Sequence, residues 1–426
     1  MPVTSLNLPD SDATWTAYEL QPPTAWTKPS APFTSRVAYA AAHVVPRALG
    51  DNTPGSSADI DWEATLAFRR HLWSWGFRVA EAMDTAQRGM GLDWAATQEL
   101  IKRSTAEARA YRQIHRTGGL VACGAGTDQL DLDRVASGQA GLEQVLAAYL
   151  EQLAVVAEAG RLDQGRGPGA IVMASRALAQ VASSPADYRF VYDAVLGSVT
   201  SPVILHWLGE IFDPALAGYW GSDDVEVATA EFVALVNDHP GKVDGVKVSL
   251  LDADHERALR AQLPRGVRLY TGDDFNYPEL VCGDGQGHSD ALLGIFAAIA
   301  PAASVALQAL DAGDDHRARE ILESTRALGR HIFAAPTYYY KTGIAFLAWL
   351  NGHQPGFTMI NGLATGRSVP HLVELFRLAD QAGLLEDPEL AAERMGAFLC
   401  VHAGTRPHDP ALGGLSTGDP APGGSR

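Results

Sequence analysis

The sequence predicts an α/β fold in which parallel strands form either a closed (β/α)8 barrel or an open doubly wound sheet. Short apolar runs alternate with longer helical patterns, which is the arrangement typical of parallel α/β proteins. Seven runs have the length of buried strands, and they cover residues 36–45, 77–83, 119–126, 169–175, 201–207, 243–250 and 266–274. An eighth run at 289–301 would close a barrel, whereas seven strands would leave an open sheet.

The helical patterns between these runs support a parallel sheet that is covered by helices. Amphipathic or strongly helical stretches are expected at residues 61–75, 93–111, 141–160, 185–197, 226–239 and 254–263. In a barrel, each strand delivers the residues at its carboxyl end to one shared pocket. Polar residues at those positions are therefore the candidates for a functional site.

The distribution of residue types divides the chain into four predicted regions. Residues 1–32 are rich in Pro and Thr and are expected to be an irregular leader, and residues 33–325 are expected to form the barrel. Residues 326–402 are expected to form a C-terminal helical extension. Residues 403–426 are dominated by Gly, Pro and Asp, so a disordered tail is expected.

The composition excludes several classes of protein. A formal net charge of -17 argues against binding to nucleic acid or to an anionic membrane surface. Cys123, Cys282 and Cys400 are far apart, so neither a disulfide framework nor a zinc knuckle is indicated. Neither a signal peptide nor an apolar stretch long enough to span a membrane is visible, and we expect a cytoplasmic protein.

Lys247 lies between Val246 and Val248 in an apolar strand-like run. Desolvation on a buried strand lowers the pKa of a lysine toward the range in which a neutral amine can attack a carbonyl group. Lys247 is therefore a candidate nucleophile for an imine. The alternative is a lysine that reaches the surface or pairs with an acid.

Six of the expected strands end in polar residues that a barrel would bring to one face. These are Asp84 with Thr85, Thr127 with Asp128, Ser175 with Arg176, His206 with Glu210, Lys247 with Ser249, and Asp273 with Asp274 and Asn276. Of these, His206 has a side chain that can exchange protons near neutral pH, although a structural histidine is equally compatible with its position.

Two further patterns allow more than one interpretation. Asp273 and Asp274 could bind substrate hydroxyls, hold the Lys247 amine or contribute to a metal site, but Gly-Asp-Asp-Phe-Asn is also a common turn sequence. His206, Glu210, Asp84 and Asp273 could form a nitrogen–oxygen metal site of the kind found in sugar isomerases. The run Tyr338–Tyr340 before Lys341 is interpreted as part of a structural or interfacial helix.

Several consecutive elements resemble the dihydrodipicolinate synthase and N-acetylneuraminate lyase family of class I aldolases. GVKVSLLDADHERALRAQL at 245–263 resembles that family's Schiff-base strand and following helix, and VRLYTGDDFNYPELVCGDGQG at 267–287 resembles its next strand and Gly-Asp-Asp turn. The resemblance continues through 299–320 and 338–352. It implies a (β/α)8 TIM barrel with additional C-terminal helices.

Upstream the chain departs from the family's pattern. Thr85 corresponds to the first threonine of the family's Gly-Thr-Thr-Gly-Glu loop, but Ala86 replaces the second, and Gln87 with Arg88 replaces Gly-Glu. The second threonine helps to bind the carboxylate of a 2-oxo acid in the family, so Arg88 or Arg176 would have to supply that contact. His206 stands where the family has its catalytic tyrosine, and Trp207 stands where it has an asparagine.

The resemblance implies a lyase or aldolase in which Lys247 forms the imine, His206 transfers protons and Thr85 is a relay partner. The residues expected to bind a small 2-oxo acid or sugar-derived carbonyl substrate are Asp84, Arg176, Glu210, Gly272, Asp273, Asp274 and Asn276. No organic cofactor or metal is required, and the family implies a homo-oligomer. The alternatives are a metal-dependent isomerase or epimerase and a non-catalytic binding barrel.

Overall fold

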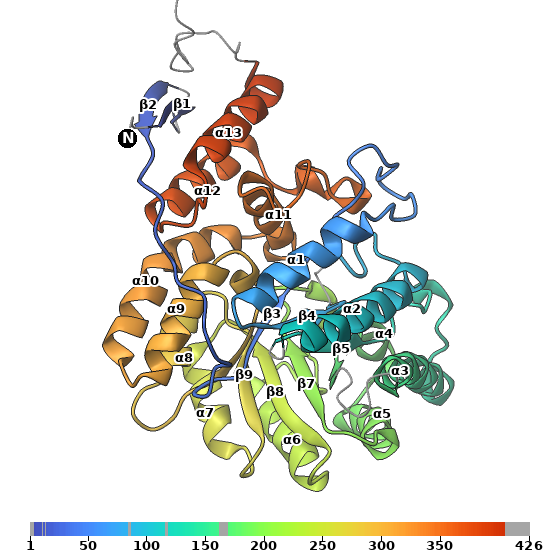
Figure 1. Cartoon of the computed structure of the whole chain (residues 1–426). Coiled ribbons are helices and arrows are strands. Elements are labelled where there is room, and N and C mark those ends of the chain that lie inside the picture. Colours follow the sequence, from blue (N-terminus) through green and yellow to red (C-terminus); the bar gives the residue numbers. More distant parts are fainter. Residues whose placement is uncertain are drawn as a thin grey trace, which may run out of the picture.

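Eight parallel strands close into a barrel in the computed structural model, which describes residues 4–10, 12, 14–83, 87–115, 118–161 and 169–404. Their order around the barrel is β10-β3-β4-β5-β6-β7-β8-β9 (Figure 1). The strands are β3 (Ala38–Ala41), β4 (Arg78–Glu81), β5 (Val121–Ala125), β6 (Gly169–Val172), β7 (Val203–Leu208), β8 (Val243–Ser249), β9 (Arg268–Thr271) and β10 (Asp290–Leu293). Seven lie within the runs identified in the sequence and β7 exceeds its run by one residue, Leu208, so the barrel prediction is confirmed.

Helices cover the outside of the barrel and continue beyond it. They are α1 (Trp62–Ser74), α2 (Trp94–His115), α3 (Gly138–Arg161), α4 (Arg176–Val181), α5 (Pro185–Ser198), α6 (Val225–Asp238), α7 (Ala253–Gln262), α8 (Tyr277–Cys282), α9 (Ala300–Asp311), α10 (Asp315–Ile332), α11 (Tyr340–Leu350), α12 (Val369–Gln381) and α13 (Pro388–Ala403). Several begin at a residue whose side chain accepts a hydrogen bond from the first turn, including Asp61, Asp252 and Asp387. The sequence thus specifies where these helices start.

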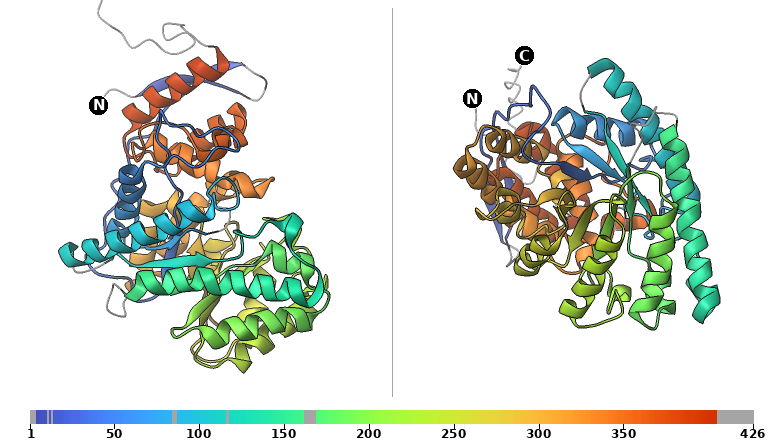
Figure 2. Two further views of the ribbon diagram at one scale, coloured as in Figure 1. Left: turned by 90° about the vertical axis from the view of Figure 1, so that its right-hand side faces the viewer. Right: turned by 90° about the horizontal axis from the view of Figure 1, so that it is seen from below.

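The C-terminal helices form a separate layer on the barrel, as Figure 2 shows from the side. The chain's first residues pack against this layer as an antiparallel hairpin of β1 (Ser5–Pro9) and β2 (Trp15–Glu19). Leu6 and Leu8 are buried, and the Tyr18 hydroxyl donates a hydrogen bond of 2.8 Å to Asp380. The expectation of an irregular leader is therefore wrong for these residues, because alternating leucines give the strand a buried face despite the surrounding prolines.

The structure can be compared with two of the predicted region boundaries, at residues 325/326 and 402/403. The boundary between residues 325 and 326 falls inside α10, and the division there stays a prediction. Helix α13 ends at Ala403, and residues 405–426 of the expected tail lie outside the described part of the chain. Among the helices that the structure describes, none is long and apolar enough to cross a membrane.

An apolar cluster lies inside the barrel. Tyr39 and Tyr270 meet edge to face at 5.9 Å between ring centroids. Other buried members of this inner cluster are Ala80, Ala122, Ile171, Ile204 and Leu292. Ala41, Met83 and Met173 extend this cluster to the carboxyl ends of β3, β4 and β6, where polar side chains lie beside them.

Candidate active site

Lys247 lies on the inner face of β8, beside two strands that carry polar or aromatic side chains. It is in register with His206 on β7 and with Tyr270 on β9. Its neighbours Val246 and Val248 are buried in the apolar layer that also includes the outer helices. Because side chains alternate along a strand, this packing turns the half-buried Lys247 toward the barrel interior.

Gly272, the first residue after β9, leaves room for the lysine side chain. A Cβ atom built on Gly272 would lie 2.1 Å from Ser249 Oγ, 2.7 Å from the Val248 carbonyl oxygen and 2.9 Å from Lys247 Cε. Such distances are too short for non-bonded atoms, so a larger residue would displace the lysine stem or the strand. Gly272 is thus a spacing residue of the site, whereas the prediction that it binds substrate stays untested.

His206 is held in the interior next to Lys247 and Ser249. Its Nε2 lies 3.1 Å from Ser249 Oγ, and the side chain is buried. Burial, together with the positive charge of Lys247, holds the pKa of His206 well below its usual range. The imidazole is therefore neutral at physiological pH.

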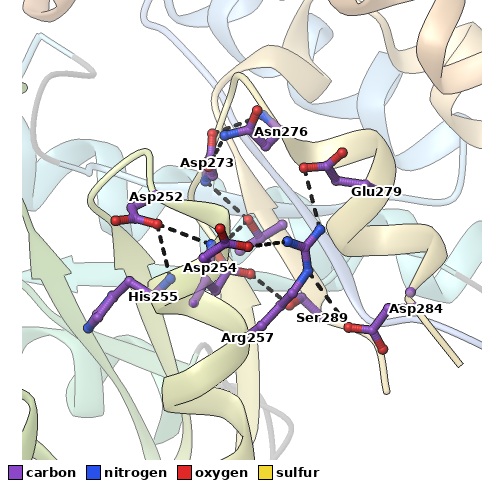
Figure 3. Close-up of polar contacts among 12 residues, drawn as sticks. Asp252, Asp254, His255, Arg257, Asp273, Asn276, Glu279, Asp284 and Ser289 are labelled. Carbon is purple, nitrogen blue, oxygen red and sulfur yellow. Dashed lines mark hydrogen bonds and ion pairs between the residues drawn. The ribbon is translucent and has the colours of Figure 1, made fainter. Parts of the chain in front are cut away.

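Asp273 forms the turn that follows β9, as the alternative interpretation of the sequence expected. Its Oδ1 accepts hydrogen bonds of 2.9 Å from the backbone N–H groups of Phe275 and Asn276, and its Oδ2 accepts one of 2.8 Å from Asn276 Nδ2. Figure 3 shows the Asp273 carboxylate directed at Asn276. The carboxylate is occupied within the turn, so its contribution to the site is to fix the backbone around Gly272 and Asp274.

The buried carboxyl group of Glu256 stabilises this turn through hydrogen bonds. Glu256 on α7 accepts hydrogen bonds from Thr271 Oγ1 at 2.9 Å and from Ser289 Oγ at 2.7 Å, and the Asp273 N–H donates to Thr271 Oγ1 at 3.1 Å. Burial raises the pKa of Glu256 to about 8. Figure 3 shows the surrounding polar network of α7, which includes Asp252, Asp254 and Arg257.

Asp274 lies among the positive charges of the barrel mouth. Its Oδ1 accepts a hydrogen bond of 2.8 Å from the Ile295 N–H. Burial raises the pKa of Asp274 to about 7, although this hydrogen bond and the charges of Lys247 and Lys341 act in the opposite direction. A carboxyl group with this pKa can exchange a proton with a neighbouring amine near neutral pH.

Lys341 is a second buried lysine at the same end of the barrel. It belongs to α11 of the C-terminal layer, and its Nζ donates a hydrogen bond to the carbonyl oxygen of Ala41 at the end of β3. Burial lowers the pKa of Lys341 to about 7, and the charge of Lys247 adds to that effect. The C-terminal extension therefore contributes a titratable amine to the barrel mouth.

The opposite side of the mouth is held by Arg88. Its guanidinium donates hydrogen bonds to Asp128, to the Ala82 carbonyl oxygen at 3.1 Å and to the Gly124 carbonyl oxygen at 2.8 Å. Arg88 is also buried, so its charge is balanced within the protein. Arg88 links the ends of β4 and β5, and it is not free to take the role of an anion contact.

A cavity of about 540 Å³ opens over the carboxyl ends of β5, β6 and β7. Arg176 lies at its rim, half exposed, and its Nε donates a hydrogen bond of 2.5 Å to Asp213. The lining also includes Thr127, Ser175 and Tyr338, of which Tyr338 belongs to the C-terminal layer. Lys247 is not one of the residues that line this cavity.

The remaining candidates are not brought together. Glu210 is exposed on the loop after β7. Among the described residues, no group of three possible metal ligands includes His206, Glu210 or Asp273. Asp84, Thr85 and Ala86 lie outside the described part of the chain. The role of Thr85 as a relay partner and the altered loop therefore stay predictions from the sequence.

A family model described as "Protein of unknown function (DUF993)" matches residues 6–404. The chain belongs to this family. A comparison with curated proteins found no match for the DUF993 chain.

Solved structures similar to the DUF993 chain are dihydrodipicolinate synthases and their relatives. The enzyme from Aquifex aeolicus is 15% identical with a TM-score of 0.58, covering 82% of this chain and 99% of its own. The enzyme from Thermotoga maritima is 16% identical with a TM-score of 0.56, covering 83% and 100%. A prophage protein of the same family from E. coli K12, solved in complex with pyruvate, is 16% identical with a TM-score of 0.56, covering 82% and 99%. The resemblance seen in the sequence is confirmed at the level of the fold.

Lys341 and Glu256 are residues of the candidate site that sequence reasoning missed. The run of tyrosines before Lys341 suggested a packing helix, and α11 is indeed almost entirely buried. The same signal that identified Lys247, a lysine within an apolar segment, was present at Lys341 in KTGIAFLAWL. The sequence contained no sign that this distant helix reaches the end of β3.

Proposed function

We propose that the protein is a Schiff-base-forming lyase or aldolase that acts on a small 2-oxo acid or a sugar-derived carbonyl compound through Lys247. The observation that carries the proposal is the position of Lys247 on β8, inside a closed barrel of the dihydrodipicolinate synthase type, in register with the buried His206. The 2-oxo acid class is further supported by the pyruvate complex of the E. coli relative.

The chemistry begins with a neutral amine. Lys247 attacks the carbonyl carbon and gives a carbinolamine, which loses water to form a protonated imine. The imine withdraws electrons from the neighbouring carbon, so that a bond to that carbon can break or form. Cleavage, condensation and dehydration all use this step, and the reaction direction is left open.

Protons enter and leave through groups beside the lysine. Neutral His206 relays a proton from the attacking nitrogen to the carbinolamine oxygen, which then takes up the proton lost earlier by Lys247 and leaves as water. Ser249 Oγ, 3.1 Å from the His206 Nε2, extends the path along β8. Asp274, with a pKa raised by burial to about 7, receives the proton that Lys247 must lose before attack. His206 thereby replaces the tyrosine that the related enzymes are expected to use.

Substrate selection is assigned to the cavity over the carboxyl ends of β5, β6 and β7. Arg176 and Arg88 both line this cavity, and Arg88 is paired with Asp128. Thr127 and Ser175 supply hydroxyl groups, with Thr127 Oγ1 lying 2.6 Å from Ser175 Oγ. A carboxylate or phosphate on the substrate would pair with Arg176 in competition with Asp213. A homo-oligomer remains part of the proposal by analogy with the family.

The test is reductive trapping followed by intact-mass spectrometry. Wild type is incubated with pyruvate, other 2-oxo acids and sugar-acid aldehydes, and then treated with borohydride. We expect a mass increase equal to the carbonyl compound less one oxygen atom, and its absence in Lys247→Ala. Lys341→Met is the matched control, because it removes the other buried amine of the mouth while leaving Lys247 in place.

Two outcomes would contradict the proposal. An adduct that persists in Lys247→Ala and maps to Lys341 would move the nucleophile to α11. The lack of any adduct in wild type across the panel would favour the isomerase or the non-catalytic barrel. Loss of an isomerase activity on treatment with a chelator would then separate these two alternatives.

A further inference from the structure

Two histidines and a glutamate from distant parts of the chain meet where the barrel joins the C-terminal layer. His71 lies in the last turn of α1, His353 follows α11, and Glu386 precedes α13. One ligand atom from each side chain lies within 4.8 Å of the other two. The ring centroids of His71 and His353 are 4.0 Å apart, and His353 Nε2 lies 3.0 Å from Glu386 Oε1.

The surroundings suit one small ion. The three side chains line a hollow with a volume of about 10 Å³, which is close to the space that one water molecule needs. Ala298, Pro301 and Leu347 form apolar walls of the same hollow. The Glu386 side chain is 38% exposed and the His353 side chain 19%, so the hollow has access to solvent from one side.

Neighbouring groups hold the backbone at Glu386 and the His71 ring in place. Asn351 Oδ1 accepts a hydrogen bond of 3.1 Å from the Glu386 N–H, and Asn351 Nδ2 donates one of 2.9 Å to the Leu384 carbonyl oxygen. The Phe68 ring stacks on His71 with an interplanar angle of 11°. Orientation by a second layer of contacts is a usual property of metal ligands.

We propose that His71, His353 and Glu386 form a divalent metal site, best suited to Zn²⁺, that links the barrel to the C-terminal helices. Two imidazole nitrogens and one carboxylate oxygen are a donor set that zinc accepts, with water in the fourth position. The site is separate from Lys247, and the proposal does not depend on the imine chemistry. Its role is to fasten α11, which carries Lys341, to α1 of the barrel.

The test uses the full chain, stripped with a chelator and titrated with Zn²⁺ alone. We expect about one equivalent bound per chain and a melting temperature raised by about 5 °C or more at saturation. Co²⁺ in place of Zn²⁺ is expected to give the intense visible absorption of a tetrahedral site. Because these readouts need no substrate, they stay informative if no imine is found.

Variants separate a built site from surface binding. His353→Ala and Glu386→Gln are expected to weaken Zn²⁺ binding about 100-fold. His239→Ala is the matched control, because His239 also contacts a carboxylate, Asp193 at 2.8 Å, and is expected to leave binding unchanged. Absence of the tetrahedral Co²⁺ spectrum in wild type, or equal Zn²⁺ affinity in all variants, would overturn the proposal.

Discussion

The two sides of the barrel mouth treat their charged groups differently. On the lysine side, formed by β7, β8 and β9, Lys247 is half-buried and its neighbours His206 and Asp274 have strongly shifted pKa values. On the first-strand side, formed by β3, β4 and α1, Arg69 and Glu81 are completely buried and form a bidentate salt bridge. Arg69 Nη2 lies 2.7 Å from Glu81 Oε1, and Arg69 Nε lies 2.9 Å from Glu81 Oε2.

This difference separates groups that can react from groups that maintain the structure. Each oxygen of Glu81 is also bonded elsewhere, to Ser104 Oγ and to the Ala82 N–H. A saturated ion pair has no remaining capacity for a substrate, whereas a neutral histidine and a carboxyl group with a pKa of about 7 can exchange protons. The contrast predicts that substitutions on the first-strand side affect stability, and those on the lysine side affect chemistry.

The largest effect on stability is expected from Arg69→Met. The substitution leaves the buried Glu81 carboxylate without its partner, and we expect the free energy of unfolding to fall by about 3–5 kcal/mol. Urea denaturation measures this loss, with Arg103→Met as the control, because Arg103 and Glu99 form an exposed pair in α2. Replacing both Arg69 and Glu81 by apolar residues should recover most of the loss, and a loss below about 1 kcal/mol in Arg69→Met would contradict a structural role.

A smaller effect is expected from Gly272→Ala on the lysine side. The added methyl group collides with Ser249 Oγ and the Val248 carbonyl oxygen, and we expect a cost of about 1–3 kcal/mol together with slower trapping of carbonyl compounds at Lys247. Gly197→Ala is the control, since a Cβ there meets no atom within 4 Å. If both variants trap equally well, Gly272 does not set the position of the lysine.

Glu256→Gln is expected to change the pH dependence of stability. Its pKa is raised by burial to about 8, so between about pH 4.5 and 8 the folded chain keeps a proton that the unfolded chain releases. The contribution of this group to stability is therefore lost as the pH rises through that window. We expect Glu256→Gln to be more stable than wild type by on the order of 3–5 kcal/mol at pH 9 and similar to it near pH 4, measured by urea denaturation. Identical pH profiles would show that Glu256 is ionised in the folded chain.

The smallest effect is expected from Lys341→Met, which tests whether the two sides of the mouth communicate. The charge of Lys341 near Lys247 favours the neutral, reactive form of that amine. We expect the variant to form the trapped adduct about threefold to tenfold more slowly at pH 7, with the difference disappearing at high pH. Lys242→Met is the control. Lys242 immediately precedes β8, at the amino end of the strand and away from the barrel mouth, and its Nζ donates a hydrogen bond to the Val199 carbonyl oxygen. An unchanged rate would make Lys341 purely structural.

The sequence was most informative where local pattern and tertiary position coincide. Apolar runs with following helices were sufficient to locate all eight strands, because buried parallel strands are apolar on both faces. Lys247 stood out because charge is rare in such a run, and the Gly272–Asp274 turn was recognisable from its residue types.

The parts that could not be predicted depend on contacts between distant residues. No local sequence pattern indicates that Arg88 pairs with Asp128. None indicates that Asp273 hydrogen-bonds within its own turn, whereas Asp274 lies near Lys247 and Lys341. The β1–β2 hairpin was missed because its stability comes from packing on α12 and α13. The Lys341 contact with Ala41 joins residues 300 positions apart, which is beyond the reach of any local pattern.

That last contact has a consequence for the order of events during synthesis. Strands β3 to β10 emerge before α11, so the barrel can pair all its strands before Lys341 has been translated. The contact of Lys341 with Ala41 joins the first strand of the barrel to one of the last helices to be made. A nascent or C-terminally truncated chain would thus have a closed barrel that lacks the Lys341 amine at its mouth, and Lys247 would reach its full reactivity at neutral pH only once α11 has packed against β3.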